Sequence, residues 1–88
     1  MILEELLSSK GRVKVLNIML EYGALNLTEI MRKSGLSYTS VVRHLEYLKK
    51  VGIVKEIRYG KLRIFLLEER NSLVIALKNL LEVSRKMS

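Results

Sequence analysis

Arginine, lysine and hydroxyl side chains gather in the middle of the chain, and these are groups that bind phosphates and the edges of bases. Residues 32–63 contain nine of the sixteen basic side chains but only two of the nine acidic ones. The remaining residues are neutral overall, although the net charge of the chain is +7. A local surplus of this kind is typical of a surface that meets nucleic acid. The alternative is a thermophile-type surface, which would distribute both signs of charge evenly.

Side chains suited to catalysis or metal binding are scarce. The chain has no cysteine and a single histidine, His44, and all its carboxylate side chains are glutamates. A disulfide framework, a zinc finger and a thiol nucleophile are therefore excluded. Metal hydrolases and nucleophile-His-acid triads need a denser set of such groups. We expect no enzyme activity, no metal site and no cofactor.

The groups best suited to base contact fall on one predicted helix, which Ser37 caps and which runs to Val51 before Gly52. One face of this helix is an apolar core stripe of Val41, Val42, Leu45 and Leu48. The opposite face carries Thr39, Ser40, Arg43, Tyr47 and Lys50. Arginine can form two hydrogen bonds to guanine, and serine and threonine bind base edges or phosphate. We predict that this face, together with Ser37, contacts DNA; the alternative is an ordinary solvated helix face.

His44 and the two tyrosines of this helix each allow two interpretations. His44 lies between the core stripe and the exposed face, next to Arg43. Since no second ligand type is near, packing or a phosphate contact is favoured over a metal site, and we include His44 among the DNA-binding candidates. Tyr38 and Tyr47 could pack beside the core stripe or touch DNA. Tyr47, on the polar face, is the better candidate for DNA contact.

Residues 53–67 change to a period of two and predict a β-hairpin with a type II′ turn at Gly60-Lys61. In this register Arg58 lies opposite Arg63, and the repulsion between them destabilises the free hairpin. With Lys61 they fit a phosphate backbone or a narrow minor groove. The alternative is a hairpin in which Glu56 neutralises the arginines. We expect the other face to pack on the helices, and it consists of Ile57, Tyr59, Leu62, Ile64 and Leu66.

The elements that must position these residues can be read from caps and periodicity. A short apolar helix around residues 3–7 precedes a helix that Ser9 caps and Gly23 ends. Residues 24–27 suit an edge strand. Thr28 is the expected cap of the next helix, which Gly35 ends. Two helices joined by a short glycine-containing turn over about residues 28–51 form a helix-turn-helix.

The last predicted helix, about residues 70–86, has an apolar arc of about 180°, wider than the ~100° needed to cover one domain. The surplus predicts a homodimer interface containing Leu73, Leu77, Leu80, Leu81 and Ser84. The alternative is that the whole arc packs on Leu3, Leu6 and Leu7 of the same chain.

The stretch from Leu25 to Leu67 resembles the winged helix-turn-helix domain of archaeal and bacterial transcription regulators. The matching segments are L-T-E-I, S-G-L-S, T-S-V-V-R-H-L-E-Y-L-K-K-V-G-I-V and the hairpin, and the earlier S-S-K-G-R-V-K-V-L-N-I-M-L-E looks like the first helix of archaeal members. The resemblance is closest to the arsenic-repressor-like and multiple-antibiotic-resistance-regulator-like groups. It implies that Ser37 to Val51 is the recognition helix and Arg58 to Arg63 the wing.

These observations predict an α+β, mostly helical fold: one winged helix-turn-helix domain over residues 1–88, with a hairpin wing at 53–67 and a C-terminal dimerisation helix. The expected function is sequence-specific binding of double-stranded DNA by a homodimeric transcription regulator, most simply a repressor. The alternatives are an architectural DNA-coating protein and a winged module for protein contact. With no signal peptide and no apolar run of 18 residues, we expect a soluble cytoplasmic protein without a membrane partner. The sequence indicates no small-molecule effector and no operator.

Overall fold

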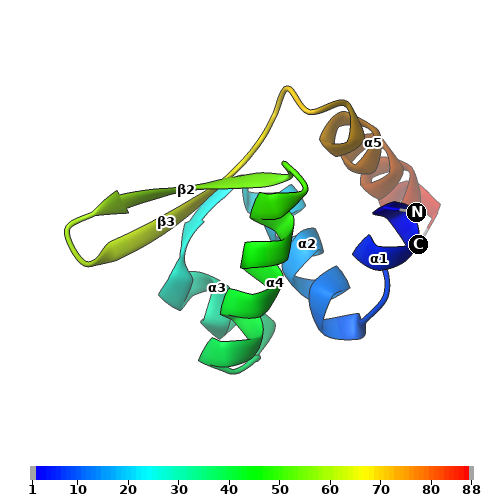
Figure 1. Cartoon of the computed structure of the whole chain (residues 1–88). Coiled ribbons are helices and arrows are strands. Elements are labelled where there is room, and N and C mark those ends of the chain that lie inside the picture. Colours follow the sequence, from blue (N-terminus) through cyan, green and yellow to red (C-terminus); the bar gives the residue numbers. More distant parts are fainter. Residues whose placement is uncertain (1, 88) are drawn as a thin grey trace.

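Five helices and one small antiparallel sheet make up the computed structural model, which describes residues 2–87 (Figure 1). Element bounds in chain order are α1 Ile2–Leu6, α2 Lys10–Tyr22, β1 Ala24–Asn26, α3 Leu27–Ser34, α4 Tyr38–Lys50, β2 Val54–Tyr59, β3 Leu62–Leu67 and α5 Ser72–Met87. The fold class predicted from the sequence is confirmed, as is the order of its elements. Within the described residues, no helix is both long enough and apolar enough to cross a membrane.

Serine residues begin helices α2 and α4, and glycine residues end α2 and α3, as the sequence predicted. The Ser9 hydroxyl accepts from the backbone N–H of Arg12 at the start of α2, and Ser37 does the same for Ser40 at the start of α4. Gly35 ends α3 with φ of 71°, a left-handed conformation that a side chain would strain. Gly35 and Ser37 fix the short turn between α3 and α4, and therefore the angle between these two helices.

The cap of α3 differs from the prediction. Asn26, rather than Thr28, is the N-cap: its Oδ1 accepts from the N–H of Glu29 at 2.8 Å. The Glu29 carboxylate in turn accepts from the N–H of Asn26 at 2.9 Å. This reciprocal capping box satisfies two backbone donors, whereas a cap at Thr28 would start the helix two residues later. Asn26 therefore ends β1 and starts α3 without a connecting loop.

The sheet has the order β1-β3-β2, with β1 at one edge. The predicted hairpin register is confirmed: Tyr59 pairs with Leu62, Arg58 with Arg63, and Ile57 with Ile64. Gly60, the first central residue of the turn, has a positive φ of 62°, as a type II′ turn requires. Lys61, the second central residue, does not have a positive φ, because no described non-glycine residue does.

The prediction of which hairpin face packs on the helices was wrong. Val54, Phe65 and Leu67 are buried there, on the same face as Arg58 and Arg63. The face predicted to be inside is turned outward: Tyr59 is 79% exposed and Ile57 46% exposed. Only the base of the hairpin lies over the helices, and its tip projects away from them (Figure 1).

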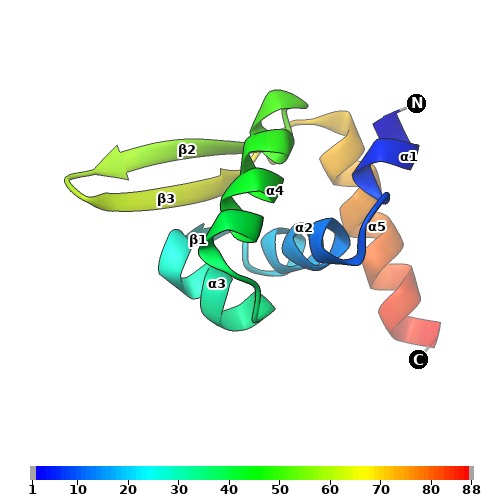
Figure 2. The same cartoon turned by 60° about the horizontal axis from the view of Figure 1, so that its bottom comes forward.

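The core lies between α2, α4, the sheet base and the start of α5. The largest fully buried side chain is Phe65. Both chain ends lie with α1 and α5, on the side opposite the hairpin tip (Figure 1). The helix α4 crosses the front of the molecule with no other element over it when the view is turned by 60° (Figure 2).

Candidate nucleic-acid interface

The outer face of α4 presents the polar side chains that the sequence assigned to DNA binding. Ser37, Thr39, Arg43 and Lys50 are exposed, and Ser40 is half-buried. The Ser37 hydroxyl also donates to Ser40 Oγ at 3.1 Å, so these two hydroxyls are fixed at the start of the helix. Arg43 has exposed neighbours one turn away on both sides, Thr39 and Glu46.

The carboxylate of Glu46, the acidic side chain of α4, is paired with Lys49 of the same helix. Lys49 Nζ lies 2.9 Å from the Glu46 carboxylate and 2.8 Å from that of Glu56 on β2. These hydrogen bonds raise the pKa of Lys49 above its ordinary value, Glu56 contributing most. Lys49 is therefore engaged in joining α4 to the hairpin, while Arg43 and Lys50 carry the cationic charge of the exposed face.

Tyr47, one turn after Arg43 on α4, is only partly exposed. Its ring packs against the core, its hydroxyl donates to the Glu5 carboxylate at 3.3 Å, and the Arg12 guanidinium lies 3.8 Å from its ring centre. Burial and the Glu5 charge raise the pKa of the hydroxyl. Tyr47 therefore joins α4 to α1 and α2, and its contact with DNA stays a prediction from the sequence.

The prediction for His44 is corrected, because only 5% of this residue is exposed and it faces the core side of α4. Its Nε2 would lie 2.9 Å from a Cβ added at Gly11, so the glycine makes room for the ring. Its Nδ1 has no hydrogen-bond partner within residues 2–87. Burial first, then the charges of Arg12 and Arg43, lower the pKa of His44 below 6.5. The ring is neutral at pH 7 and packs between α2 and α4.

The arginines of the hairpin meet at Glu56. The Glu56 carboxylate accepts from Arg63 Nε at 2.7 Å, from Lys49 at 2.8 Å and from Arg58 Nε at 3.3 Å. Its side chain is only 7% exposed, and the pKa of Glu56 falls to about 2, chiefly through the hydrogen bond from Arg63. This geometry agrees with the second interpretation given for the hairpin, in which Glu56 neutralises the two arginines.

The two arginines have different environments as a result. The side chain of Arg63 is 17% exposed, and Glu56 raises its pKa, so Arg63 is part of the hairpin's internal structure. The side chain of Arg58 is 68% exposed, and Lys61 is exposed in the turn. Arg58, although it also donates to Glu56, and Lys61 are thus the exposed cations of the wing tip among the predicted candidates.

Tyr38, the other tyrosine of α4, is more exposed than Tyr47. It is 54% exposed at the start of α4, between the exposed helix face and the hairpin, and it also contributes to the raised pKa of Arg63. The sequence places Tyr38 between Ser37 and Thr39, two residues predicted to contact DNA, and this position was the available indication of its exposure.

The five residues predicted for a dimer interface divide into two groups. Leu77 is 8% exposed and belongs to the chain's own core, with Leu73 and Leu81 half-buried against it. Leu80 is 64% exposed and Ser84 is exposed. A groove of about 280 Å³ runs along this side of α5, between α1 and α2, with Leu3, Leu7, Leu80, Leu81 and Ser84 among its lining residues.

Within residues 2–87, no three histidine, cysteine or acidic side chains lie together as a metal site would require.

An uncovered, basic helix that follows a short turn and precedes a β-hairpin defines a winged helix-turn-helix protein. The sequence of residues 9–56, more than half of the chain, matches the family described as bacterial regulatory protein, arsR family. The chain belongs to this family of DNA-binding transcription regulators. No curated protein matches the chain.

Solved structures with the same fold include HlyU from Vibrio cholerae, which is 22% identical with a TM-score of 0.76, covering 91% of this chain and 84% of HlyU. The transcriptional repressor PagR of Bacillus anthracis is 25% identical with a TM-score of 0.70, covering 88% of this chain and 85% of PagR. The DNA-binding domain Mb0332 from Mycobacterium bovis, described as homodimeric, is 22% identical with a TM-score of 0.70, covering 93% of this chain and 73% of that domain.

Proposed function

We propose that this regulator is a repressor that binds a specific DNA site as a homodimer, with α4 in the major groove and the hairpin tip on the minor groove or phosphate backbone. The observation that carries the proposal is the exposed face of α4, on which Arg43 lies between Thr39 and Lys50 with no element over it. An arginine in that position can read guanine, and a hydroxyl beside it can bind a base edge or phosphate.

The proposed DNA contacts combine base reading with phosphate binding. Arg43 is the base-reading residue, because it lies in the middle of the exposed face. Lys50, at the last residue of α4, together with Arg58 and Lys61 on the wing, binds phosphates. The remaining proposed contacts are Ser37, Tyr38, Thr39 and Ser40. His44 is left out because it is buried, Arg63 because it is bound to Glu56, and Tyr47 because its hydroxyl is bound to Glu5.

The proposed dimer forms through the outer side of α5 and the groove beside α1. Exposed apolar side chains on α5 support this, since Ile75, Leu80 and Val83 are each about half exposed or more. The description of Mb0332 as homodimeric and of PagR as a repressor supports the same proposal. We propose further that residues 1–88 act as one winged helix-turn-helix domain. An archaeal source stays an expectation from the resemblance of the first helix, and a thermophile-type surface stays the alternative reading of the charge.

Selection of bound duplexes from a random pool tests the proposal. We expect enrichment of a two-fold symmetric sequence with half-sites about one helical turn apart, because a two-fold dimer presents two α4 helices to one side of the duplex. Binding without any enriched sequence would instead favour an architectural DNA-coating protein.

A further inference from the structure

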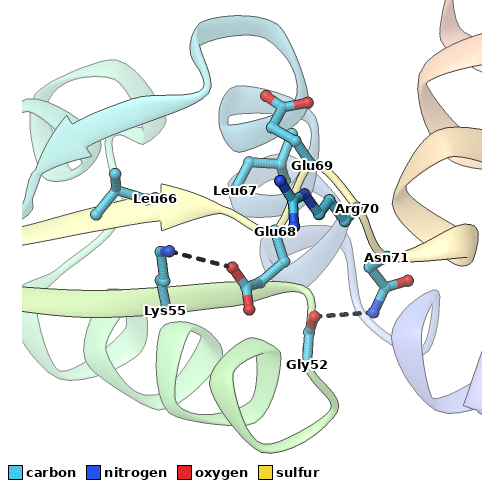
Figure 3. Close-up of a pocket in the computed structure, with 8 residues that line it drawn as sticks. All are labelled: Gly52, Lys55, Leu66, Leu67, Glu68, Glu69, Arg70 and Asn71. Atoms are coloured by element: carbon cyan, nitrogen blue, oxygen red, sulfur yellow. Dashed lines mark hydrogen bonds and ion pairs between the residues drawn. The ribbon is translucent and has the colours of Figure 1, made fainter.

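Asn71 connects the end of α4 to the start of α5. Its Nδ2 donates to the backbone carbonyl of Gly52 at 2.9 Å, directly after α4 (Figure 3). Its Oδ1 accepts from the N–H groups of Leu73 at 2.8 Å and Val74 at 3.2 Å, in the first turn of α5. One half-buried side chain is thus the N-cap of α5 and a direct hydrogen-bond donor to the segment that ends α4.

A second hydrogen bond joins the same two segments. The N–H of Glu68, in the connection to α5, donates to the carbonyl of Ile53 at 2.8 Å, and the N–H of Asn71 donates to Glu68 at 3.0 Å. On the α4 side, Gly52 has φ of 82° and its N–H donates to Lys49. The connection therefore cannot rotate at its Gly52 end without breaking a hydrogen bond.

Apolar packing alone leaves the direction of α5 less constrained. Beyond the junction, Val74 and Leu77 are the buried residues of α5. Burial of apolar surface has no preferred direction, whereas a hydrogen bond weakens steeply when its geometry is lost. Arg85 of α5 also pairs with Glu21 of α2 at 3.1 Å, but both side chains are about half exposed, and such pairs contribute little. Asn71 is therefore the side chain that directly joins the start of α5 to the end of α4.

We propose that Asn71 is a positioning residue that sets the distance between the two recognition helices of the dimer, and hence the half-site spacing that the protein prefers. This inference rests on the proposed homodimer. If α5 pairs with its copy, any change in the angle between α5 and α4 moves both α4 helices relative to the two-fold axis. Because half-sites lie at fixed intervals along the duplex, such a change alters the match to a given spacing.

Two substitutions separate the two roles of Asn71. Asn71→Asp keeps an oxygen that caps α5 but has no N–H to donate to Gly52. Asn71→Ser also keeps a capping oxygen, carries no charge, and is too short to bridge the two segments. Ser72→Asp, at the exposed residue next to Asn71, is the matched control, since it adds a negative charge at the start of α5 and keeps the Asn71 side chain.

The measurement is the affinity of the full chain and its variants for duplexes that carry the selected half-site once, or twice at spacings varied by two base pairs. For the wild-type chain and Ser72→Asp, we expect one spacing to bind about tenfold more tightly than its neighbours. In both Asn71 variants we expect this ratio to fall by about threefold to tenfold, the equivalent of one hydrogen bond. Affinity for the single half-site should stay within about twofold, since α4 itself is unchanged.

Three outcomes would overturn the inference. Equal losses at every spacing would mean that Asn71 acts only as a helix cap. An unchanged spacing ratio in both variants, with folding intact by circular dichroism, would mean that packing alone sets the angle. A wild-type chain without any spacing preference would overturn the proposed dimeric function, and the inference with it.

Discussion

At the scale of single residues, Arg43 and Lys50 share the exposed face of α4 but differ in position: Arg43 is central and Lys50 is terminal. We predict that Arg43→Ala weakens binding to the selected site by about 1–3 kcal/mol and relaxes the base preference at one position of each half-site. Lys50→Ala should weaken binding to selected and unrelated duplexes alike. Fluorescence anisotropy with both duplexes measures this. Equal losses on both duplexes for Arg43→Ala would mean that Arg43 binds only the backbone.

Glu56 gives a prediction about acid stability. Its pKa is about 2 in the folded chain, against an ordinary value of 4.5. Between these values the unfolded chain takes up a proton that the folded chain does not, so the stabilisation by Glu56 is complete above pH 4.5 and is lost as the pH falls through about 2.

Glu56→Gln should therefore lower the free energy of unfolding by about 1–3 kcal/mol at pH 7, because Lys49 and Arg63 lose a charged partner. The difference from the wild type should narrow at pH 3 and nearly vanish near pH 2. Urea unfolding at these pH values measures it. A difference that does not change with pH would contradict the lowered pKa of Glu56.

The sequence identified the exposed residues of α4 well and the inward ones less well. Thr39, Arg43 and Lys50 lie where helical spacing placed them. The contact of Tyr47 with Glu5 was not predicted, because Glu5 lies 42 residues earlier and no local pattern shows that α1 folds against this side of α4. His44 was placed at the surface because it lies at the margin of the apolar stripe of its helix. Its ring is buried because Gly11 on α2 has no side chain and leaves room for it, which the sequence of α4 does not show.

At the scale of elements, the wing now has two candidate cations for phosphate. We predict that replacing Arg58 and Lys61 together with alanine flattens the slope of log affinity against log salt by about 1–2, since each phosphate neutralised contributes ~0.9. The fold should be unaffected, because both side chains are exposed. Titrations at several salt concentrations measure the slope.

Arg63→Ala is the matched variant for the wing, because Arg63 makes the shortest contact to Glu56. It should lower the unfolding temperature and change the salt slope less than the Arg58 and Lys61 double variant. A wing that does not touch DNA would leave the slope of the double variant equal to that of the wild type.

The hairpin shows where sequence pattern fails at this scale. Its register followed from the Gly60 turn, but both faces carry apolar residues, and the longer stripe appeared to be the core face. The structure buries the shorter stripe of Val54, Phe65 and Leu67, since these residues lie mainly at the base of the hairpin, where the helices are. How far the tip projects depends on tertiary packing, which the period of two does not encode.

The helix α5 gives the prediction that separates a dimer from a folded monomer. Leu80→Glu should produce a monomer that stays folded, because Leu80 is 64% exposed. Leu77→Glu should unfold the chain, because Leu77 is in the core of its own chain. Sedimentation velocity and circular dichroism distinguish the two. A wild-type chain that sediments as a monomer at micromolar concentration would contradict the dimer.

At the scale of the whole molecule, the surplus of seven positive charges in residues 32–63 belongs to α3, α4 and the hairpin, which lie on the side away from the two chain ends. The sequence predicted both the basic part and the apolar arc of α5, because charge and apolar arc are properties of composition and period. It did not predict how the parts are joined. The capping box at Asn26 and the bridge from Asn71 to Gly52 use short polar side chains that have no distinctive pattern in sequence.

Mapping of backbone amide chemical shifts, with and without a duplex that carries the selected site, tests most directly that α4 and the wing tip form the DNA interface. We expect the largest changes at Ser37 to Arg43 and at Arg58 to Lys61, with small changes on the outer side of α5. Changes confined to α1 and α5, or to the apolar outer face around Ile57 and Leu62, would contradict this account.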